Sequence, residues 1–148
     1  MKALVVFKSY HHGNTKKVAE AIAPVLNAKL LGLDGAKASD LNGFDLIGFG
    51  SGIYAFNVHG SLLKFIESLQ MQNGKKCFVF STSGSGNPGQ HKKAVEALKA
   101  KGFEILGEFS CKGFDTFGPF KLMGGMAKGH PDHEDLENAK SFAERLKD

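Results

Sequence analysis

Long apolar runs and cysteines are both scarce in this chain of 148 residues. The first apolar stretch, residues 3–7, is followed at once by Lys8 and Ser9, so it is too short for a signal peptide or a membrane span. We therefore expect a cytoplasmic protein that makes no membrane contact. The two cysteines, Cys77 and Cys111, both fall in strand-like stretches, which favours buried reduced thiols over a disulfide or a metal-binding pair.

The motifs that bind nucleoside triphosphates and dinucleotides are also missing. These motifs read G-x-x-x-x-G-K-[ST] and G-x-G-x-x-G, whereas the loop over residues 9–15, Ser-Tyr-His-His-Gly-Asn-Thr, contains a single glycine. A phosphate-accepting receiver domain needs acidic residues at the ends of its first and third strands. Here the corresponding predicted strands end in Lys8-Ser9 and Gly50-Ser51, which excludes that class.

Basic residues outnumber acidic ones by 19 to 15, which gives a formal net charge of +4. The lysines occur mainly in pairs, as at positions 16–17, 75–76 and 92–93, a pattern typical of solvated helix faces and strand ends. Aromatic residues do not alternate with them, so we expect no nucleic-acid partner. The positive charge would instead steer an acidic redox partner or an anionic substrate.

Apolar periodicity alternates between strand and helix along the whole chain. The pattern predicts strands over residues 3–7, 30–33, 45–50, 77–80 and 103–111. It predicts helices beginning near Asn14, Ser61, Gly89 and Asp132, the last with a capping box to Asp135. Strands joined by crossover helices form a parallel sheet with helices on both faces. We therefore expect one α/β domain over residues 1–148.

The loop between the first strand and the first helix is the strongest functional signal. It ends at a helix N-terminus, where unpaired backbone N–H groups and the helix dipole favour an anion. Gly13 permits a close backbone approach, and Ser9 and Thr15 supply hydroxyls. These features indicate a phosphate site. A plain helix cap formed by Asn14 or Thr15 is the other interpretation of the same residues.

Unusual loops also follow the third and fourth predicted strands. Residues 51–60 combine glycines with Tyr54 and Phe56, which suit stacking on a large aromatic ring or, alternatively, covering the end of the sheet. Residues 81–89 contain no large apolar side chain, as in an exposed turn or a polar pocket lined by backbone. In parallel α/β sheets the carboxyl ends of the strands meet at the ligand crevice.

These loops resemble those of the flavodoxin family. The resemblance rests on Gly13-Asn14-Thr15 after a serine-containing strand end, on residues 50–54 (Gly-Ser-Gly-Ile-Tyr), and on the length of the chain. It implies a doubly wound five-stranded parallel sheet of order 2-1-3-4-5 in a three-layer α/β/α fold. It also implies non-covalent FMN. The FMN contacts that the resemblance assigns are Ser9, His11, His12, Gly13, Asn14, Thr15, Ser51, Gly52, Ile53, Tyr54, Ala55, Phe56, Thr82, Ser83, Gly84, Gly86 and Asn87.

The chain departs from the flavodoxin pattern at several points. His11 and His12 stand where threonines are usual, and Ala55 stands where a glycine often permits a peptide flip beside the ring. The third loop lacks the usual stacking tyrosine, with only His91 nearby, and the net charge is basic rather than acidic. These departures weigh against a low-potential electron shuttle more than against an FMN protein.

Two further segments carry chemistry-bearing residues. Residues 113–129 are rich in Phe, Met and Gly, and such a loop suits covering the ring, binding a quinone-like substrate, forming a homodimer contact or lying flat on the core. Residues 130–135 contain two histidines and three acids. We expect no metal there, because the acids fit a helix N-terminus and the His-x-x-His spacing is poor for joint chelation.

Three functions are compatible with these sequence features. The favoured one is electron transfer between redox partner proteins through FMN, with no catalytic side chain. The alternative is an FMN-dependent NAD(P)H:quinone-type oxidoreductase, which the long apolar loop and the basic charge favour. The third is a flavin-free phosphate-binding module on the same fold. Fold alone does not decide among them.

Overall fold

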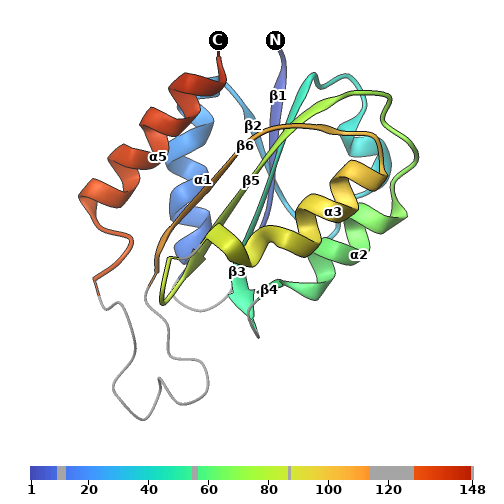
Figure 1. Cartoon of the computed structure of the whole chain (residues 1–148). Coiled ribbons are helices and arrows are strands. Elements are labelled where there is room, and N and C mark those ends of the chain that lie inside the picture. The colour runs from blue at the N-terminus through green and yellow to red at the C-terminus, as the bar shows by residue number, and fades with distance from the viewer. Residues whose placement is uncertain (10–12, 55–56, 87, 114–128, 148) are drawn as a thin grey trace.

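The sheet at the centre of the molecule has six strands, five of them parallel (Figure 1). The computed structural model describes residues 1–9, 13–54, 57–86, 88–113 and 129–147. The parallel strands are β1 (Ala3–Lys8), β2 (Lys29–Gly32), β3 (Leu46–Tyr54), β5 (Lys76–Ser83) and β6 (Glu104–Lys112), in the order β2-β1-β3-β5-β6. The short strand β4 (Asn57–Val58) pairs antiparallel with β3. The predicted order is therefore confirmed.

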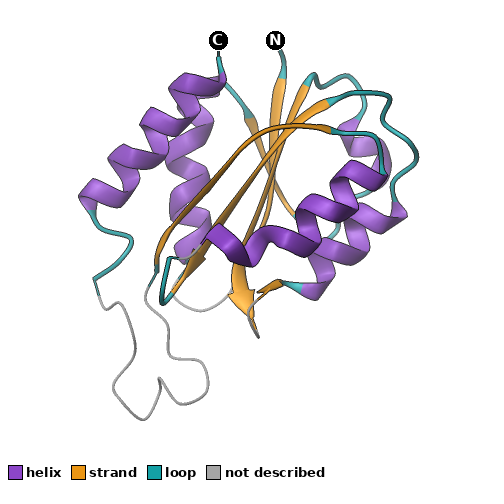
Figure 2. Cartoon of the chain, in the orientation of Figure 1, coloured by secondary structure: helices purple, strands orange, loops and turns teal. Residues whose placement is uncertain are grey.

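Helices cover both faces of this sheet (Figure 2). On one face lie α1 (Asn14–Leu26) and α5 (His133–Leu146), and on the other lie α2 (Gly60–Ser68) and α3 (Lys92–Ala100). Two short 3₁₀ helices, η1 (Ala38–Leu41) and η2 (Pro88–His91), complete the described elements. The predicted doubly wound three-layer architecture is confirmed. None of the helices in the described ranges has both the length and the hydrophobicity that crossing a membrane requires.

Each face of the sheet has its own apolar core, because side chains alternate along every strand. In β1, Leu4 and Val6 pack toward α2 and α3, whereas Ala3 and Val5 pack toward α1 and α5. The central strands are buried on both faces, which explains their nearly continuous apolar runs. Cys77 and Cys111 are free and buried, as predicted. Burial raises the pKa of each thiol to about 12, so both stay protonated and unreactive.

Three local predictions need correction. Residues 51–54 extend strand β3, and Ile53 and Tyr54 pair with β4, so the segment predicted as a loop contains a β-ladder. The helix predicted to be capped by Ser61 begins at Gly60 and has His59 as its N-cap. The helix predicted from Gly89 is divided into η2 and α3. By contrast, the capping box between Asp132 and Asp135 is present as predicted.

Two glycines in β3 make room for aromatic rings of the neighbouring strand. A Cβ atom at Gly48 would overlap the tip of the Phe78 ring, and one at Gly50 would overlap the tip of the Phe80 ring. The two rings are stacked, with centroids 6.1 Å apart, and both are fully buried against the α1 and α5 face. The two glycines therefore allow the Phe78 and Phe80 rings to pack between β3 and α1, the helix that starts at the predicted phosphate loop.

We expect Gly50→Ala to destabilise the fold by about 1–3 kcal/mol, because the added methyl group would force the buried Phe80 ring out of its rotamer. Gly32→Ala is the matched control: it also places a methyl group on a strand, but nothing lies within 4 Å of it. Urea unfolding of both variants measures the difference. Equal stabilities for the two variants would contradict this account, and Phe80→Leu should partly rescue Gly50→Ala.

Candidate functional site

The described residues of the predicted site lie at one edge of the sheet. The carboxyl ends of β1, β3 and β5 lie side by side, in the register Lys8–Ser51 and Ser51–Ser81. The chain leaves β1 for α1 on one face and leaves β3 for α2 on the other (Figure 1). This is a topological switch point, where open α/β sheets form their ligand crevice.

The start of α1 has the form that an anion site requires. Gly13 is its N-cap and lies in the left-handed region, with φ 66°. Because glycine has no side chain, no capping hydrogen bond comes from this residue. The Lys16 N–H donates to Ser9 Oγ at 3.3 Å, which joins the described residues on either side of this loop. Asn14 and Thr15 are the first two helical residues and are both buried. Neither is the cap, so the interpretation of this loop as an Asn14 or Thr15 cap is wrong.

Hydrogen bonds and close packing tie this loop to its neighbours. The Thr15 hydroxyl lies 3.0 Å from the Thr82 hydroxyl in a buried contact between α1 and β5. Gly113, just after β6, packs so closely on Asn14 that a Cβ there would lie 2.8 Å from the Asn14 Nδ2 atom. The Gly113 N–H also donates to the Ser83 carbonyl oxygen at 2.9 Å. The described ends of the first and third predicted loops therefore meet and form one wall of the candidate site.

The second wall is the β3–β4 hairpin. Ile53 pairs with Val58 and Tyr54 with Asn57, and the buried Ser51 hydroxyl accepts from the His59 N–H at 2.8 Å. The Tyr54 ring is half-buried and meets the His59 ring edge-on, with centroids 5.0 Å apart. This contact braces the tyrosine at the carboxyl end of β3, the edge of the sheet at which ligands bind in folds of this kind.

His59 keeps a neutral ring. The Ser61 N–H donates to its Nδ1 atom at 3.0 Å, and the Ser61 hydroxyl lies 2.7 Å from the same nitrogen. A nitrogen that accepts a hydrogen bond carries no proton, so the proton of the ring is on Nε2. Burial, and then the nearby Lys8 charge, lower the pKa of His59. A capping role for this histidine was not foreseen from the sequence.

The third loop is built from small residues fixed by hydrogen bonds. The Gly86 N–H donates to Ser83 Oγ at 2.8 Å, and the Ser110 hydroxyl donates to the Gly86 carbonyl at 2.8 Å. Gly86 has φ 69°, and a Cβ there would lie 3.3 Å from the β6 backbone. Only a glycine fits this position. Thr82, Ser83 and Gly84 are buried, and Ser85 is exposed.

A row of polar side chains crosses the sheet at this edge. Lys8, Ser51, Ser81 and Ser110 occupy one register line through β1, β3, β5 and β6. The Lys8 ammonium donates to Asp34 Oδ1 at 2.7 Å, in a pair whose side chains are 7% and 83% exposed respectively. This row closes the apolar core on the α2 and α3 face. Of these four residues, only Ser51 was predicted from the sequence to belong to the site.

Ser81 belongs to a buried hydrogen-bond chain. Its hydroxyl lies 2.5 Å from His91 Nε2, and His91 Nδ1 lies 3.0 Å from Glu108 Oε1. Burial lowers the pKa of His91, against the opposing effect of Glu108. The order of acid, histidine and hydroxyl resembles a hydrolase triad. However, Ser81 is fully buried, which excludes attack on an external substrate, and His91 is too deeply buried to stack on a ligand.

Several predicted residues fall outside the described ranges. They are His11 and His12 of the first loop, Ala55 and Phe56 of the hairpin, Asn87 of the third loop, and residues 114–128. Their assignment to the site stays a prediction.

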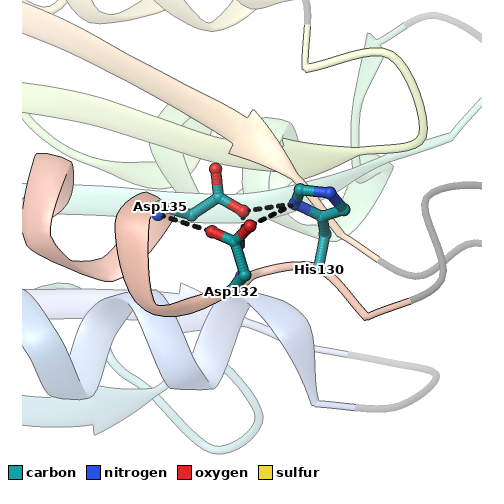
Figure 3. Close-up of side chains that lie close together, drawn as sticks. All are labelled: His130, Asp132 and Asp135. Carbon is teal, nitrogen blue, oxygen red and sulfur yellow. Dashed lines mark hydrogen bonds and ion pairs between the residues drawn. The ribbon is translucent and has the colours of Figure 1, made fainter.

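His130, Asp132 and Asp135 come together at the start of α5, with ligand-type atoms within 4.8 Å of one another (Figure 3). The three side chains already bind one another. Asp135 Oδ2 accepts from the Asp132 N–H at 2.9 Å and from His130 Nδ1 at 2.5 Å, and Asp132 Oδ1 accepts from the Asp135 N–H at 2.9 Å. The bond from the Asp135 N–H is the main cause that lowers the pKa of Asp132. The cluster is a helix cap.

We expect acidification to weaken the fold through His59. Its pKa in the folded state is lowered, so below about pH 6.5 the unfolded chain binds more protons and stability falls as pH falls. Asn at an N-cap preserves capping without titrating. His59→Asn should therefore lose less stability between about pH 7 and pH 5 than the natural chain in urea unfolding. His133→Asn, on an exposed part of α5, is the control. A His59→Asn profile parallel to the natural one would contradict this assignment.

Comparison with known proteins agrees with the fold described above. The family model described as a flavodoxin domain matches residues 4–118. An uncharacterized protein of Methanocaldococcus jannaschii is 48% identical over 148 residues, which cover 99% of this chain and 98% of that protein.

Solved flavodoxin structures have the same fold. A flavodoxin of Streptococcus pneumoniae TIGR4 superposes with a TM-score of 0.73 at 18% identity, covering 99% of this chain and 98% of that one. A Fusobacterium nucleatum flavodoxin bound to flavin mononucleotide gives a TM-score of 0.70 at 13% identity, with 99% and 98% covered. Because the family model spans most of the sequence, the chain belongs to the flavodoxin family.

Proposed function

We propose that this protein binds FMN non-covalently at the carboxyl edge of its sheet and transfers electrons between redox partner proteins. The observation that carries the proposal is the joining of the predicted loops at the switch point, through the buried contact between Thr15 and Thr82 at 3.0 Å. Membership of the flavodoxin family and the FMN-bound relative of the same fold support the choice of cofactor.

The start of α1 would hold the FMN phosphate. Gly13 turns the backbone without a side chain in the way, so that N–H groups of the first helical turn are presented to an anion. The Thr15 hydroxyl is engaged with Thr82, so we assign the Thr15 backbone, rather than its side chain, to the phosphate. Ser9, His11 and His12 are the predicted side-chain donors of the same loop.

The hairpin and the third loop would hold the ring. Tyr54 offers an aromatic face, with Gly52 and Ile53 beside it and His59 behind it. Thr82, Ser83, Gly84 and Gly86 offer backbone groups from a loop with no bulky side chain in its described part. When bound, FMN supplies the electron-accepting chemistry. The protein's part is to orient the ring and to tune it through stacking, hydrogen bonds and local charge.

One observation favours the alternative, an FMN-dependent NAD(P)H:quinone-type oxidoreductase. The described part of the third loop carries only small residues, and His91, the ring that follows it in the sequence, is fully buried in its bonds to Ser81 and Glu108. A ring face left open by this loop would suit a flat substrate. The basic net charge of +4 would also attract an anionic nucleotide.

The deciding experiment is anaerobic reduction of the FMN-loaded protein, followed by absorbance spectra. A carrier is expected to take electrons in two resolved one-electron steps and to react slowly with NAD(P)H alone. Rapid NAD(P)H oxidation on addition of a quinone would overturn the carrier function in favour of the oxidoreductase. Absence of FMN binding in a fluorescence titration would overturn both functions.

We expect Gly13→Val to weaken FMN binding about tenfold or more, because a branched side chain at a left-handed position costs roughly 1–2 kcal/mol or displaces the loop. Tyr54→Ala should cost about 1 kcal/mol, close to fivefold, through lost stacking. Flavin fluorescence titration measures both losses.

Gly43→Val is the matched control for Gly13→Val. Gly43 has φ 84° and open space around it, as Gly13 has, but it lies just before β3 at the opposite edge of the sheet. This variant should carry similar backbone strain with unchanged FMN affinity. A larger loss from Tyr54→Ala than from Gly13→Val would count against a phosphate-centred site.

A further inference from the structure

Two pairs of lysines lie at helix starts along the carboxyl edge of the sheet. Lys16 and Lys17 are in the first turn of α1, and Lys92 and Lys93 are the first two residues of α3. All four residues are exposed. None of them forms an ion pair with another residue in the described part of the chain. We call these four residues the basic rim.

This placement of lysines works against helix stability. The helix dipole makes the N-terminus positive, so acids are usual in the first turn and cations are unfavourable there. Neither α1 nor α3 has an acid in its first turn, whereas α5 has Glu134 and Asp135. The next acids along the two helices are Glu20 and Glu96, which lie about one turn further from the edge. The basic rim therefore calls for an explanation other than folding.

Contacts of the preceding residues bring the two pairs to the end of one strand. Thr15, directly before the α1 pair, has its hydroxyl 3.0 Å from that of Thr82. His91, directly before the α3 pair, has Nε2 2.5 Å from Ser81 Oγ. Ser81 and Thr82 are consecutive in β5, and consecutive strand residues point to opposite faces. The two pairs therefore flank the end of β5, one on each face of the sheet (Figure 1).

We propose that the basic rim is the docking surface for an acidic redox protein that exchanges electrons with this chain. The proposal rests on the FMN site proposed above, at the same edge of the sheet. Exposed ammonium groups without ion-pair partners attract an acidic surface, orient it and raise its association rate. Each transfer moves one electron between the partner's cofactor and the flavin, and any proton is exchanged with solvent.

The size of an ordinary interface fits this arrangement. A standard interface buries about 800 Å² on each partner, which is a patch roughly 30 Å across. A sheet with one helix on each face is about as thick, because a helix is roughly 10–12 Å in diameter. One partner can therefore contact both lysine pairs. A nucleic acid is less well suited, because the rim consists of two separate pairs rather than one continuous basic stripe.

The first test measures binding of poly-L-glutamate, a model acidic polypeptide, to the apoprotein at low ionic strength. One variant carries glutamine at the whole rim (Lys16→Gln, Lys17→Gln, Lys92→Gln and Lys93→Gln). The matched control removes the same charge from the opposite edge of the sheet (Lys29→Gln, Lys76→Gln, Lys99→Gln and Lys101→Gln). We expect the rim variant to lose about tenfold in affinity and the control much less. Binding should disappear at about 1 M salt.

Urea unfolding shows whether the rim serves folding instead. The rim variant should unfold at the same urea concentration as the natural chain or a higher one, because it removes cations from helix N-termini. A clearly lower midpoint for the rim variant than for the control would assign the lysines to stability and overturn the docking role.

The second test uses the reduced, FMN-loaded protein and two inorganic oxidants of opposite charge, ferricyanide and tris(phenanthroline)cobalt(III). Each complex accepts one electron, and protons are released to solvent. At low ionic strength the natural chain should favour the anionic oxidant, and the rim variant should lose about tenfold of that rate ratio. The control variant should keep the natural ratio. Stopped-flow absorbance measures the rates.

The outcomes separate this inference from the function on which it rests. If the natural chain binds FMN and the rim variant keeps the natural rate ratio, the docking role is overturned while the FMN site stands. Equal losses of polyglutamate affinity in the rim and control variants would also overturn it. Tighter binding of duplex DNA than of polyglutamate at the same salt would assign the rim to nucleic acid instead. A natural chain that binds no FMN would overturn the proposed function, and the docking of a redox partner with it.

Discussion

Right-handed crossover connections are the constraint on which the rest of this molecule depends. In a parallel sheet, the connection from one strand to the next must cross over one face of the sheet. Nearly all such crossovers are right-handed. The chain therefore places α1 and α5 on one face and α2 and α3 on the other. Every loop that leaves a parallel strand does so at the same edge, so residues from distant parts of the sequence meet there.

That edge is also where the apolar interior ends, and its polar groups must be satisfied. Buried hydroxyls and charges without partners cost free energy, so each needs a bond within the fold. The structure meets this need in separate units: Lys8 with Asp34, Ser51 with the His59 backbone, Ser81 with His91, and Thr15 with Thr82. Each unit joins a strand end to a loop or helix start. These bonds hold the strand ends together at this edge of the sheet.

Local patterns were enough to predict the strands and the helices. Apolar spacing is set by neighbours in the chain, and the capping box at Asp132 is equally local. The β3–β4 hairpin was missed because its connection carries no Asn-Gly or Asp-Gly signal. His59 was missed as a cap because the usual capping residues are Ser, Thr, Asp and Asn. The contacts of Lys8 with Asp34 and of His91 with Glu108 span 26 and 17 residues. They follow from sheet register, which no local pattern specifies.

The net charge of the chain and the position of a single charged residue give different information about redox behaviour. The basic composition argued against a low-potential carrier, because flavodoxins that carry electrons are typically acidic. Most lysines of this chain are exposed, and beyond about 8–10 Å their fields are largely screened at physiological salt. They bear on partner choice and association rate more than on the flavin itself. A single ammonium that is 7% exposed at the end of β1 acts in a medium that screens it far less. The position of a charged residue in the fold therefore bears on redox behaviour more directly than the net charge of the chain.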